Sequence, residues 1–384
     1  MDIEEILLDI DHYFSSVEDP RTRESPHEFR DILLISLCSS LCGMFEWWEM
    51  STFAEAQEDW LKSKLDLSFK SGVPSEFTFE RVLSALNPKV FEKCFIHWSS
   101  SLRKVKKDDV IAIDGKTSKG SRNAKDVLHC VNAWSTANGI ALGQVATAKK
   151  SNEIKAIPEL LDSLDIKGNT ITIDAMGCQK AIAKQIIESK ANYLLALKGN
   201  QSLLFKHASQ DLDDAMDKLK TFKDQSFYQT DIEDAHGRLE FRKCLSIPVN
   251  SKDKNYDSIH FWSGVKSLSV IESHRTVKKT GKTSIERRYY ISSLEADAEK
   301  VLFCSRSHWG IENKLHWVLD VAYKEDASKV RAKNGPRVQS LLRKIALNKV
   351  KQNPLKTKRK LSFRRMQKLA LFNIQNLEHF LGIS

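Results

Sequence analysis

The sequence predicts an α/β protein in which a domain with a mixed β-sheet lies between two helical regions. Two short apolar runs in the middle of the chain, at 110–114 and 170–174, have strand character, and each ends on a carboxylate. Before and after this middle part, apolar residues recur at three-to-four spacing, over 29–45 and from 337 to 381. Strands that alternate with helices indicate a sheet covered by helices.

These patterns divide the chain of 384 residues into three regions, which suits its length. Residues 1–100 form a predicted helical N-terminal domain. Residues 101–335 form the predicted α/β domain. Residues 336–384 form a predicted helical tail with a strongly basic middle part. The tail could hold DNA through its cations or simply present a solvated helix face.

The α/β domain is predicted element by element. Strands are expected at 110–114, 128–136, 140–148, 170–174 and 193–197, and helices at 153–164 and 179–189. The polar, lysine-rich stretch at about 199–288 is predicted to be a largely β insertion, with strand-like runs at 241–247, 260–265 and 268–273. A strand at 289–294 follows, then two helices at about 296–307 and 310–321. We expect Gly310 to separate these two helices.

Composition narrows the classes of function. Lysine and arginine exceed aspartate and glutamate by 60 to 50, and a net charge of +10 indicates a polyanionic partner, nucleic acid first, although a basic protein without one is the alternative. The seven scattered cysteines fit no disulfide framework or zinc spacing. The acidic start MDIEEILLDI is not a signal peptide, and the longest apolar run, 32–45, is too short to cross a membrane.

Two carboxylates at strand ends, Asp114 and Asp174, are the first candidates for chemistry. A carboxylate at the end of a buried strand is costly unless it binds something, and two neighbouring ones repel each other unless a cation lies between them. Mg²⁺ binds carboxylates together with substrate phosphates, and two such ions can promote phosphodiester cleavage. The alternative is that each Asp only caps the next turn, and the residues alone leave both possibilities open.

A third ligand has several candidates in the segment RSHWGIENKLHWVLDVAYKED. Glu312 lies four residues from both His308 and His316, so the three could share one helix face. That spacing also allows a zinc site made of these three side chains, although it is not the zinc-protease pattern. The carboxylates that compete with Glu312 are Asp320, Glu325 and Asp326.

Longer motifs occur in order along the chain: IAIDGKTSKGS, SNEIKAIPELL, TIDAMGCQKAIA, YLLALKGNQ and HWGIENKLHWVLDVAYKEDASKVR. With PSEFTFERVLSALNP before them, they resemble the insertion-sequence transposases that include the H-repeat-associated proteins. The resemblance implies a ribonuclease-H-like catalytic domain of the DDE type, interrupted by the β insertion. It also implies that Asp114, Asp174 and Glu312 are catalytic and hold two divalent ions, Mg²⁺ with Mn²⁺ as a substitute.

The same resemblance implies partners and location. The partners are double-stranded DNA (terminal inverted repeats and target) and a second copy of the chain on DNA, and no membrane is involved. The location is the bacterial cytoplasm, in association with the nucleoid. The candidate DNA contacts are Lys116, Lys119, Arg122, Lys198, Arg238, Arg306, His308 and Lys314. Solvated basic surface is the alternative for the exposed ones.

One part of the pattern departs from the family. Better-studied relatives carry Tyr and Arg before the Glu and Lys after it, where this chain has Ser305, His308 and Leu319. Since relatives that form a DNA hairpin use that set, the resemblance does not carry a hairpin step. Two other functions stay open at this point: a DNA-binding remnant without catalysis, and a nuclease of the same fold that does not rejoin DNA.

Overall fold

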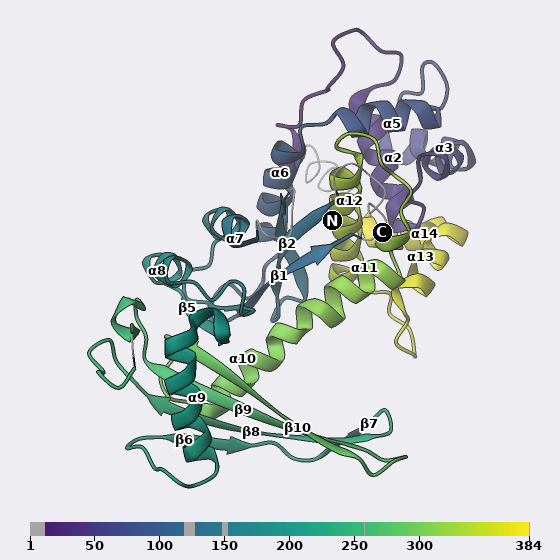
Figure 1. The fold of residues 1–384 in the computed structure, drawn as a ribbon. Coiled ribbons are helices and arrows are strands. Elements are labelled where there is room, and N and C mark those ends of the chain that lie inside the picture. The colour runs from purple at the N-terminus through teal and green to yellow at the C-terminus, as the bar shows by residue number, and fades with distance from the viewer. Residues whose placement is uncertain (1–11, 119–126, 148–152, 257, 384) are drawn as a thin grey trace.

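The computed structural model describes residues 12–118, 127–147, 153–256 and 258–383. One ten-stranded sheet runs through the molecule in the order β3-β2-β1-β4-β5-β10-β9-β8-β6, and β7 pairs with β8. Figure 1 shows the N- and C-terminal helices packed together at one end and the long strands β8, β9 and β10 at the other. The predicted α/β class is therefore confirmed.

The N-terminal region is helical, as predicted. Asn87 begins the last of its helices, because its side chain accepts hydrogen bonds from the backbone N–H groups of Lys89 and Val90, and Pro88 fills the first turn. Its helices are α2 (Phe29–Leu41), α3 (Trp47–Ala56), α4 (Glu58–Leu65), α5 (Glu76–Ala85) and α6 (Pro88–Ser101).

The central sheet is mixed, as predicted, because β1 pairs antiparallel with β2 and parallel with β4. Ile113 of β1 is in register with Ile173 of β4, so Asp114 and Asp174 follow at equivalent positions at one edge of the sheet. The elements are β1 (Val110–Thr117), β2 (His129–Ser135), β3 (Ile140–Thr147), α7 (Glu153–Asp162), β4 (Thr170–Ile173), α8 (Lys180–Glu188) and β5 (Asn192–Leu197).

The insertion continues the same sheet, because β10 pairs antiparallel with β5. It comprises η3 (Gly199–Gln201), α9 (Ser202–Met216), β6 (Ser226–Gln229), β7 (Glu233–Ala235), β8 (Arg238–Pro248), η4 (Ile259–Phe261), β9 (Ser267–Val277) and β10 (Thr283–Ser292).

Two predictions within the insertion are wrong. The segment expected to be a strand at 260–265 contains a short 3-10 helix instead. The apolar residues Ile259, in this helix, and Trp262, directly after it, are buried in the core. The helix α9 was not predicted, because dense polar residues hide its apolar face. That face consists of Leu204, Ala208, Leu212 and Ala215.

Glu312 lies within one continuous helical stretch, made of α10 (Ala298–Ile311), the π-helical segment η5 (Glu312–His316) and α11 (Trp317–Val321). The expected break at Gly310 is therefore wrong. Gly310 is buried inside α10, and a Cβ atom there would have only ordinary contacts, the nearest at 3.6 Å from Nε1 of Trp134. Gly310 therefore lies beside Trp134 within the helix and does not end it.

The first helix of the C-terminal region packs against the rest of the molecule. The long helix α12 (Gly335–Gln352) packs against α2, α5, α6 and β3, and even its cations Arg343 and Lys344 are buried. Trp60 of α4 donates a hydrogen bond to Glu378, at 2.8 Å. The remaining elements are η6 (Glu325–Ala327), α13 (Phe363–Phe372) and α14 (Ile374–Leu381). No helix among the described residues has the length and apolarity needed to cross a membrane.

Candidate active site

The three predicted carboxylates line one cleft of about 580 Å³ at the edge of the central sheet. Asp114 belongs to β1, which extends three residues beyond it, and Asp174 directly follows β4. Glu312 is the first residue of the π-helical segment η5. Asp174 lies 60 residues after Asp114 in the chain, and Glu312 lies 138 residues after Asp174. Two neighbouring strands and one helix bring these distant acids to one place.

The cleft brings acidic groups close together. Burial raises the pKa of Asp114, and the charges of Asp174 and Glu312 raise it further, to about 7. His316 has its Nδ1 atom 3.5 Å from Oδ2 of Asp114, but burial lowers the pKa of His316 to about 3, so this imidazole is neutral. Acidic groups that crowd each other in this way favour a cation between them.

Asp174 is held in place by its own turn. Its Oδ1 atom accepts hydrogen bonds from the backbone N–H groups of Met176 and Gly177, at 3.0 and 3.3 Å. Asp174 therefore caps the turn that follows β4, as the alternative interpretation expected, and it also lines the cleft. In contrast, the carboxylate of Glu312 makes no hydrogen bond or ion pair with any described residue, and it is exposed to the cleft.

The donor set fits Mg²⁺ better than zinc. Within the described ranges, no three His, Cys, Asp or Glu side chains are close enough together to hold an ion by themselves. Mg²⁺ commonly takes one or two carboxylates plus waters and substrate phosphates, whereas zinc requires three or four protein ligands. For the zinc alternative, His308 is hydrogen-bonded through Nδ1 to Thr172 at 3.1 Å and His316 lies against Asn132, and within the described ranges these histidines form no three-ligand group with Glu312.

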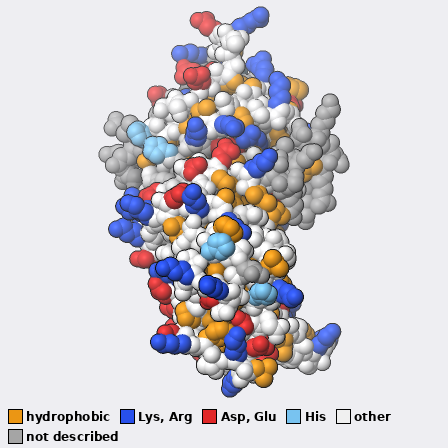
Figure 2. Space-filling view, turned by 60° about the vertical axis from the view of Figure 1, so that its left-hand side comes forward, with side chains coloured by type: hydrophobic (Ala, Val, Ile, Leu, Met, Phe, Trp, Pro, Cys, Tyr) orange, Lys and Arg blue, Asp and Glu red, His pale blue; other side chains and the backbone are white. Residues whose placement is uncertain are grey.

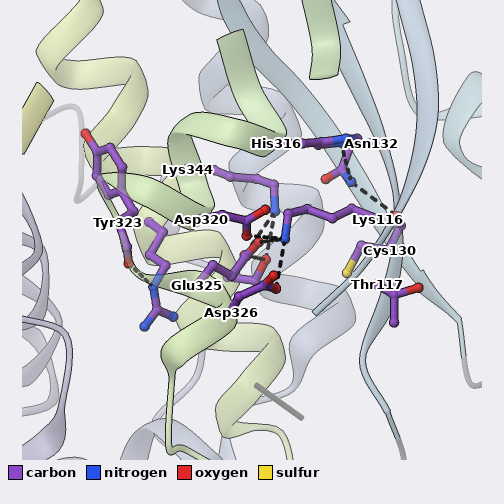
Figure 3. Close-up of polar contacts among 12 residues, drawn as sticks. Lys116, Thr117, Cys130, Asn132, His316, Asp320, Tyr323, Glu325, Asp326 and Lys344 are labelled. Atoms are coloured by element: carbon purple, nitrogen blue, oxygen red, sulfur yellow. Dashed lines mark hydrogen bonds and ion pairs between the residues drawn. The ribbon is translucent and has the colours of Figure 1, made fainter. Parts of the chain in front are cut away.

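Lys116 is not placed to contact DNA, contrary to the prediction. Its side chain is only 8% exposed, and its Nζ atom lies 2.6 Å from Asp320, 3.0 Å from Glu325 and 3.5 Å from Asp326 (Figure 3). The three carboxylates that competed with Glu312 are therefore the partners of this lysine. Burial would raise the pKa of Glu325, but Lys344 and Lys116, with Arg343, lower it to about 2.

The other predicted DNA contacts differ in their surroundings. Lys198 is exposed and lines the cleft, and Lys314 is exposed on η5. Arg238 is exposed at the start of β8. Arg306 is exposed but forms two hydrogen bonds with Glu233, at 2.5 and 3.2 Å, which offset its charge. Lys119 and Arg122 lie outside the described residues.

His308 lines the cleft, and its contact with a phosphate stays a prediction. Burial lowers its pKa and therefore disfavours the charged form that would attract a phosphate. The structure instead shows a cationic group that the sequence did not indicate. Arg288 of β10 lines the cleft, and its guanidinium carbon lies 4.6 Å from the centre of the Trp309 ring. It also donates hydrogen bonds to Glu286, at 2.9 and 3.2 Å, which partly offset its charge. Nothing in the local sequence separates Arg288 from the other insertion arginines, because Trp309 is distant along the chain.

A mixed sheet with two strand-edge aspartates and a third acid on a late helix is the arrangement that the resemblance to DDE transposases implies. Comparison with protein families agrees. Residues 105–349 match the family model described as "Transposase DDE domain", and residues 12–99 match the model described as "DDE_Tnp_1-associated". The chain therefore belongs to the DDE transposase family, as the resemblance implied.

Individual relatives cover most of the chain. "Putative transposase YncI" of Escherichia coli O157:H7 is 43% identical over 348 residues, which is 89% of this chain and 86% of the relative. "H repeat-associated putative transposase YhhI" of Escherichia coli strain K12 is 40% identical over 342 residues, 88% of each chain. A solved piggyBac transposase synaptic complex with hairpin DNA superposes with a TM-score of 0.42 at 12% identity, covering 99% of this chain and 78% of that one.

Proposed function

We propose that this protein is the transposase of an insertion sequence. It binds the terminal inverted repeats of its element, cleaves DNA at the ends with the help of divalent metal ions, and joins the ends to target DNA. The observation that carries the proposal is the shared cleft of Asp114, Asp174 and Glu312, in which burial, together with the charges of the other two acids, raises the pKa of Asp114 to about 7. Such a cleft is suited to a cation and a phosphodiester.

Each residue of the cleft has a distinct part in this proposal. Asp114, Asp174 and Glu312 would hold two Mg²⁺ ions, or Mn²⁺, which supply activation of a water or 3′-hydroxyl and stabilisation of the leaving oxygen. The turn at Met176 and Gly177 fixes one oxygen of Asp174, so this carboxylate is oriented before any ion arrives. Lys198 and Arg288 line the same cleft and would attract the phosphates of the DNA strand.

Charge supports DNA as the partner. The net charge of +10 favours association with a polyanion. Figure 2 shows Lys and Arg side chains interspersed with Asp and Glu side chains along this face of the molecule. We therefore propose that DNA contacts several separate sites along the protein, with the helical N-terminal region reading the repeat. Joining two ends requires two active sites, so we propose a homodimer on DNA, at the bacterial nucleoid.

The test is cleavage of DNA that carries the ends of the element, with Mg²⁺ or Mn²⁺ present. The Glu312→Gln and Asp114→Asn variants should lose at least about 100-fold in rate, since a metal ligand contributes several kcal/mol to the transition state. Glu299→Gln is the matched control, because Glu299 is exposed in the first turn of the same helical stretch. Its rate should equal that of the wild type.

The products separate this function from its alternatives. Cleaved ends joined to target DNA are expected for a transposase. Cleavage without joined products would indicate a nuclease of the same fold. Specific binding without cleavage, in the presence of either metal, would indicate a DNA-binding remnant. Equal cleavage by Glu312→Gln and wild type would contradict the proposed site.

A further inference from the structure

Lys116 lies in a buried cluster of charged groups beside the cleft (Figure 3). Its ammonium group reaches from β1 to Asp320 of α11 at 2.6 Å, and to Glu325 of η6 at 3.0 Å. The side chains of Lys116 and Glu325 are 8% and 5% exposed. Water is therefore largely excluded from the Lys116–Glu325 contact, whereas the side chain of Asp320 is 32% exposed. The buried pair with Glu325 holds the Lys116 ammonium group in place more firmly than an exposed pair would.

The far side of the cluster is also fixed. Glu325 accepts a hydrogen bond from Ser340 of α12, at 2.8 Å. Lys344, one turn further along α12, donates to Gln144 of β3 at 2.6 Å and to Ser340 at 2.7 Å. Glu325 is thus held between α12 and β1, so Lys116 contacts a partner that cannot easily move.

The position of Lys116 along β1 links this cluster to the catalytic cleft. Side chains two residues apart on a strand share one face of the sheet, so Lys116 and Asp114 project to the same side. The helix that carries Glu312 packs over β1 on that side. Asp320, the partner of Lys116, lies eight residues after Glu312 on this helical stretch.

Contacts to the sheet flank Glu312 in both directions. One turn before it, His308 is hydrogen-bonded to Thr172 of β4 at 3.1 Å. After it, His316 lies 3.5 Å from the Nδ2 atom of Asn132 of β2, and Asp320 is bound to Lys116. Glu312 itself has no polar partner among the described residues, so its location relative to Asp114 depends on these flanking contacts.

We propose that Lys116 is a positioning residue of the active site: its ion pair with Asp320 ties β1 to the helix of Glu312 and sets the separation of Asp114 and Glu312. This inference rests on the proposed metal-dependent function. It gives Lys116 a part in the reaction that involves no contact with DNA, metal or substrate. Removal of the ion pair should loosen the helix from the strand and weaken metal binding, while leaving DNA binding intact.

The experiment titrates Mn²⁺ alone into the full-length protein by calorimetry, without DNA, and measures DNA affinity separately in a metal chelator. Lys116→Met should weaken Mn²⁺ binding about 10-fold or more, the size of effect seen when groups that orient metal ligands are removed. Lys116→Arg, which keeps the charge, should recover most of the affinity. The DNA affinity of all variants should match the wild type.

The matched control is Arg337→Met. It removes the same charge and breaks an ion pair between α12 and Glu92 of α6, at 2.9 Å, that contacts neither β1 nor the helix of Glu312. Its Mn²⁺ affinity should equal that of the wild type even if its melting temperature falls. Should Lys116→Met not fold, Asp320→Asn breaks the same pair while leaving Lys116 its contacts with Glu325 and Asp326.

The outcomes are distinguishable. Wild-type Mn²⁺ affinity in folded Lys116→Met, or in Asp320→Asn, would overturn the positioning role and leave the proposed function standing. An equal loss in Arg337→Met would also overturn it, because general destabilisation would then account for the effect. A wild-type protein that neither binds Mn²⁺ nor cleaves DNA would overturn the proposed function and the inference together.

Discussion

At the scale of single residues, Asp114 shows the conflict between folding and function in this site. Its carboxyl group is largely buried, near two other acids and a neutral histidine, so the charged form is disfavoured. A residue chosen only for stability would not be an acid at this position. In the proposed function a cation would offset this electrostatic cost, and metal binding would then be coupled to the stability of the folded chain.

This coupling predicts a pH dependence for Asp114→Asn in the absence of metal. The wild-type carboxyl has a pKa of about 7 when folded, against an ordinary value of 3.8, so the folded protein holds a proton that the unfolded chain releases. The stability of the wild type should therefore fall as pH rises from about 4 to about 7. Asp114→Asn lacks this term and should be the more stable protein at pH 8, by at most about 4 kcal/mol.

Thermal unfolding of both proteins in a chelator, at pH 4 and pH 8, measures the effect. The difference in melting temperature should be larger at pH 8, and Mn²⁺ should reduce it by stabilising only the wild type. A difference independent of pH would show that Asp114 titrates normally in the folded protein.

Gly115 is a second residue with a strict requirement. A Cβ atom there would lie 2.3 Å from Oε1 of Glu153 and 3.0 Å from Nε2 of His129. These two side chains are buried and paired at 2.5 Å, so neither can move away without losing its partner. Only glycine allows β1 to pass this pair immediately after Asp114.

Gly115→Ala should therefore destabilise the protein by about 1–3 kcal/mol, through overpacking and a broken buried pair. Chemical denaturation measures the change. Gly199→Ala is the control, because a Cβ atom at Gly199 would meet nothing within 4 Å, and its effect should stay within about 0.5 kcal/mol. Equal stability of Gly115→Ala and wild type would mean that Glu153 is not fixed as described.

The sequence indicated some site residues and not others, for a physical reason. Asp114 and Asp174 could be proposed because a local pattern, an apolar strand followed by an acid, marks them. Glu312 could not be separated from Asp320 and Glu325 by local pattern, and only the family motif selected it. The partner that occupies Asp320 is Lys116, which lies 204 residues away in the chain. A contact between residues so far apart in the chain cannot be inferred from the spacing of residues within a motif.

At the scale of elements, the helical stretch from Ala298 to Val321 organises the site. It crosses the sheet and carries Glu312 at the point where α-helical geometry changes to π-helical. Short π-helical segments cost hydrogen-bond quality and occur mostly at functional positions. The sequence indicated two helices here because Gly310 resembles a break. Packing against the sheet overrides that local preference and keeps the helix continuous.

Gly310→Ala should stabilise the protein by about 0.5–1 kcal/mol, because alanine reduces the entropy lost on helix formation and its Cβ has room beside Trp134. Gly335→Ala, at the start of α12, is the contrasting variant, since its Cβ would lie 2.8 Å from both Ser84 and Val330. It should destabilise the protein. Denaturation curves compare the two, and a destabilised Gly310→Ala would show that the helix needs a break there.

At the scale of the whole molecule, the two ends of the chain form one body. Helix α12 packs against three N-terminal helices and against β3 of the catalytic sheet, and it contributes fourteen buried residues. The sequence placed a domain boundary at residue 336 because the charges of this region resemble a solvated tail. Arg343 and Lys344 of α12 are buried with internal partners, whereas most of the basic residues after α12, such as Lys356 and Arg359, are exposed, so the boundary at 336 stays a prediction.

This arrangement predicts the result of two truncations. A chain that ends at residue 334 lacks α12 and would expose the apolar surfaces of α2, α5 and α6 that α12 covers. It should be insoluble, or lack cooperative unfolding, because apolar burial is the main stabilising term of a domain.

A chain that ends at residue 360 keeps α12 and loses only α13 and α14. It should fold with reduced stability, since it loses the buried residues Leu377 and Phe380 and the hydrogen bond from Trp60. Solubility and calorimetric unfolding measure both. A soluble, cooperatively folded chain ending at 334 would show that the rest of the fold does not require residues 336–384.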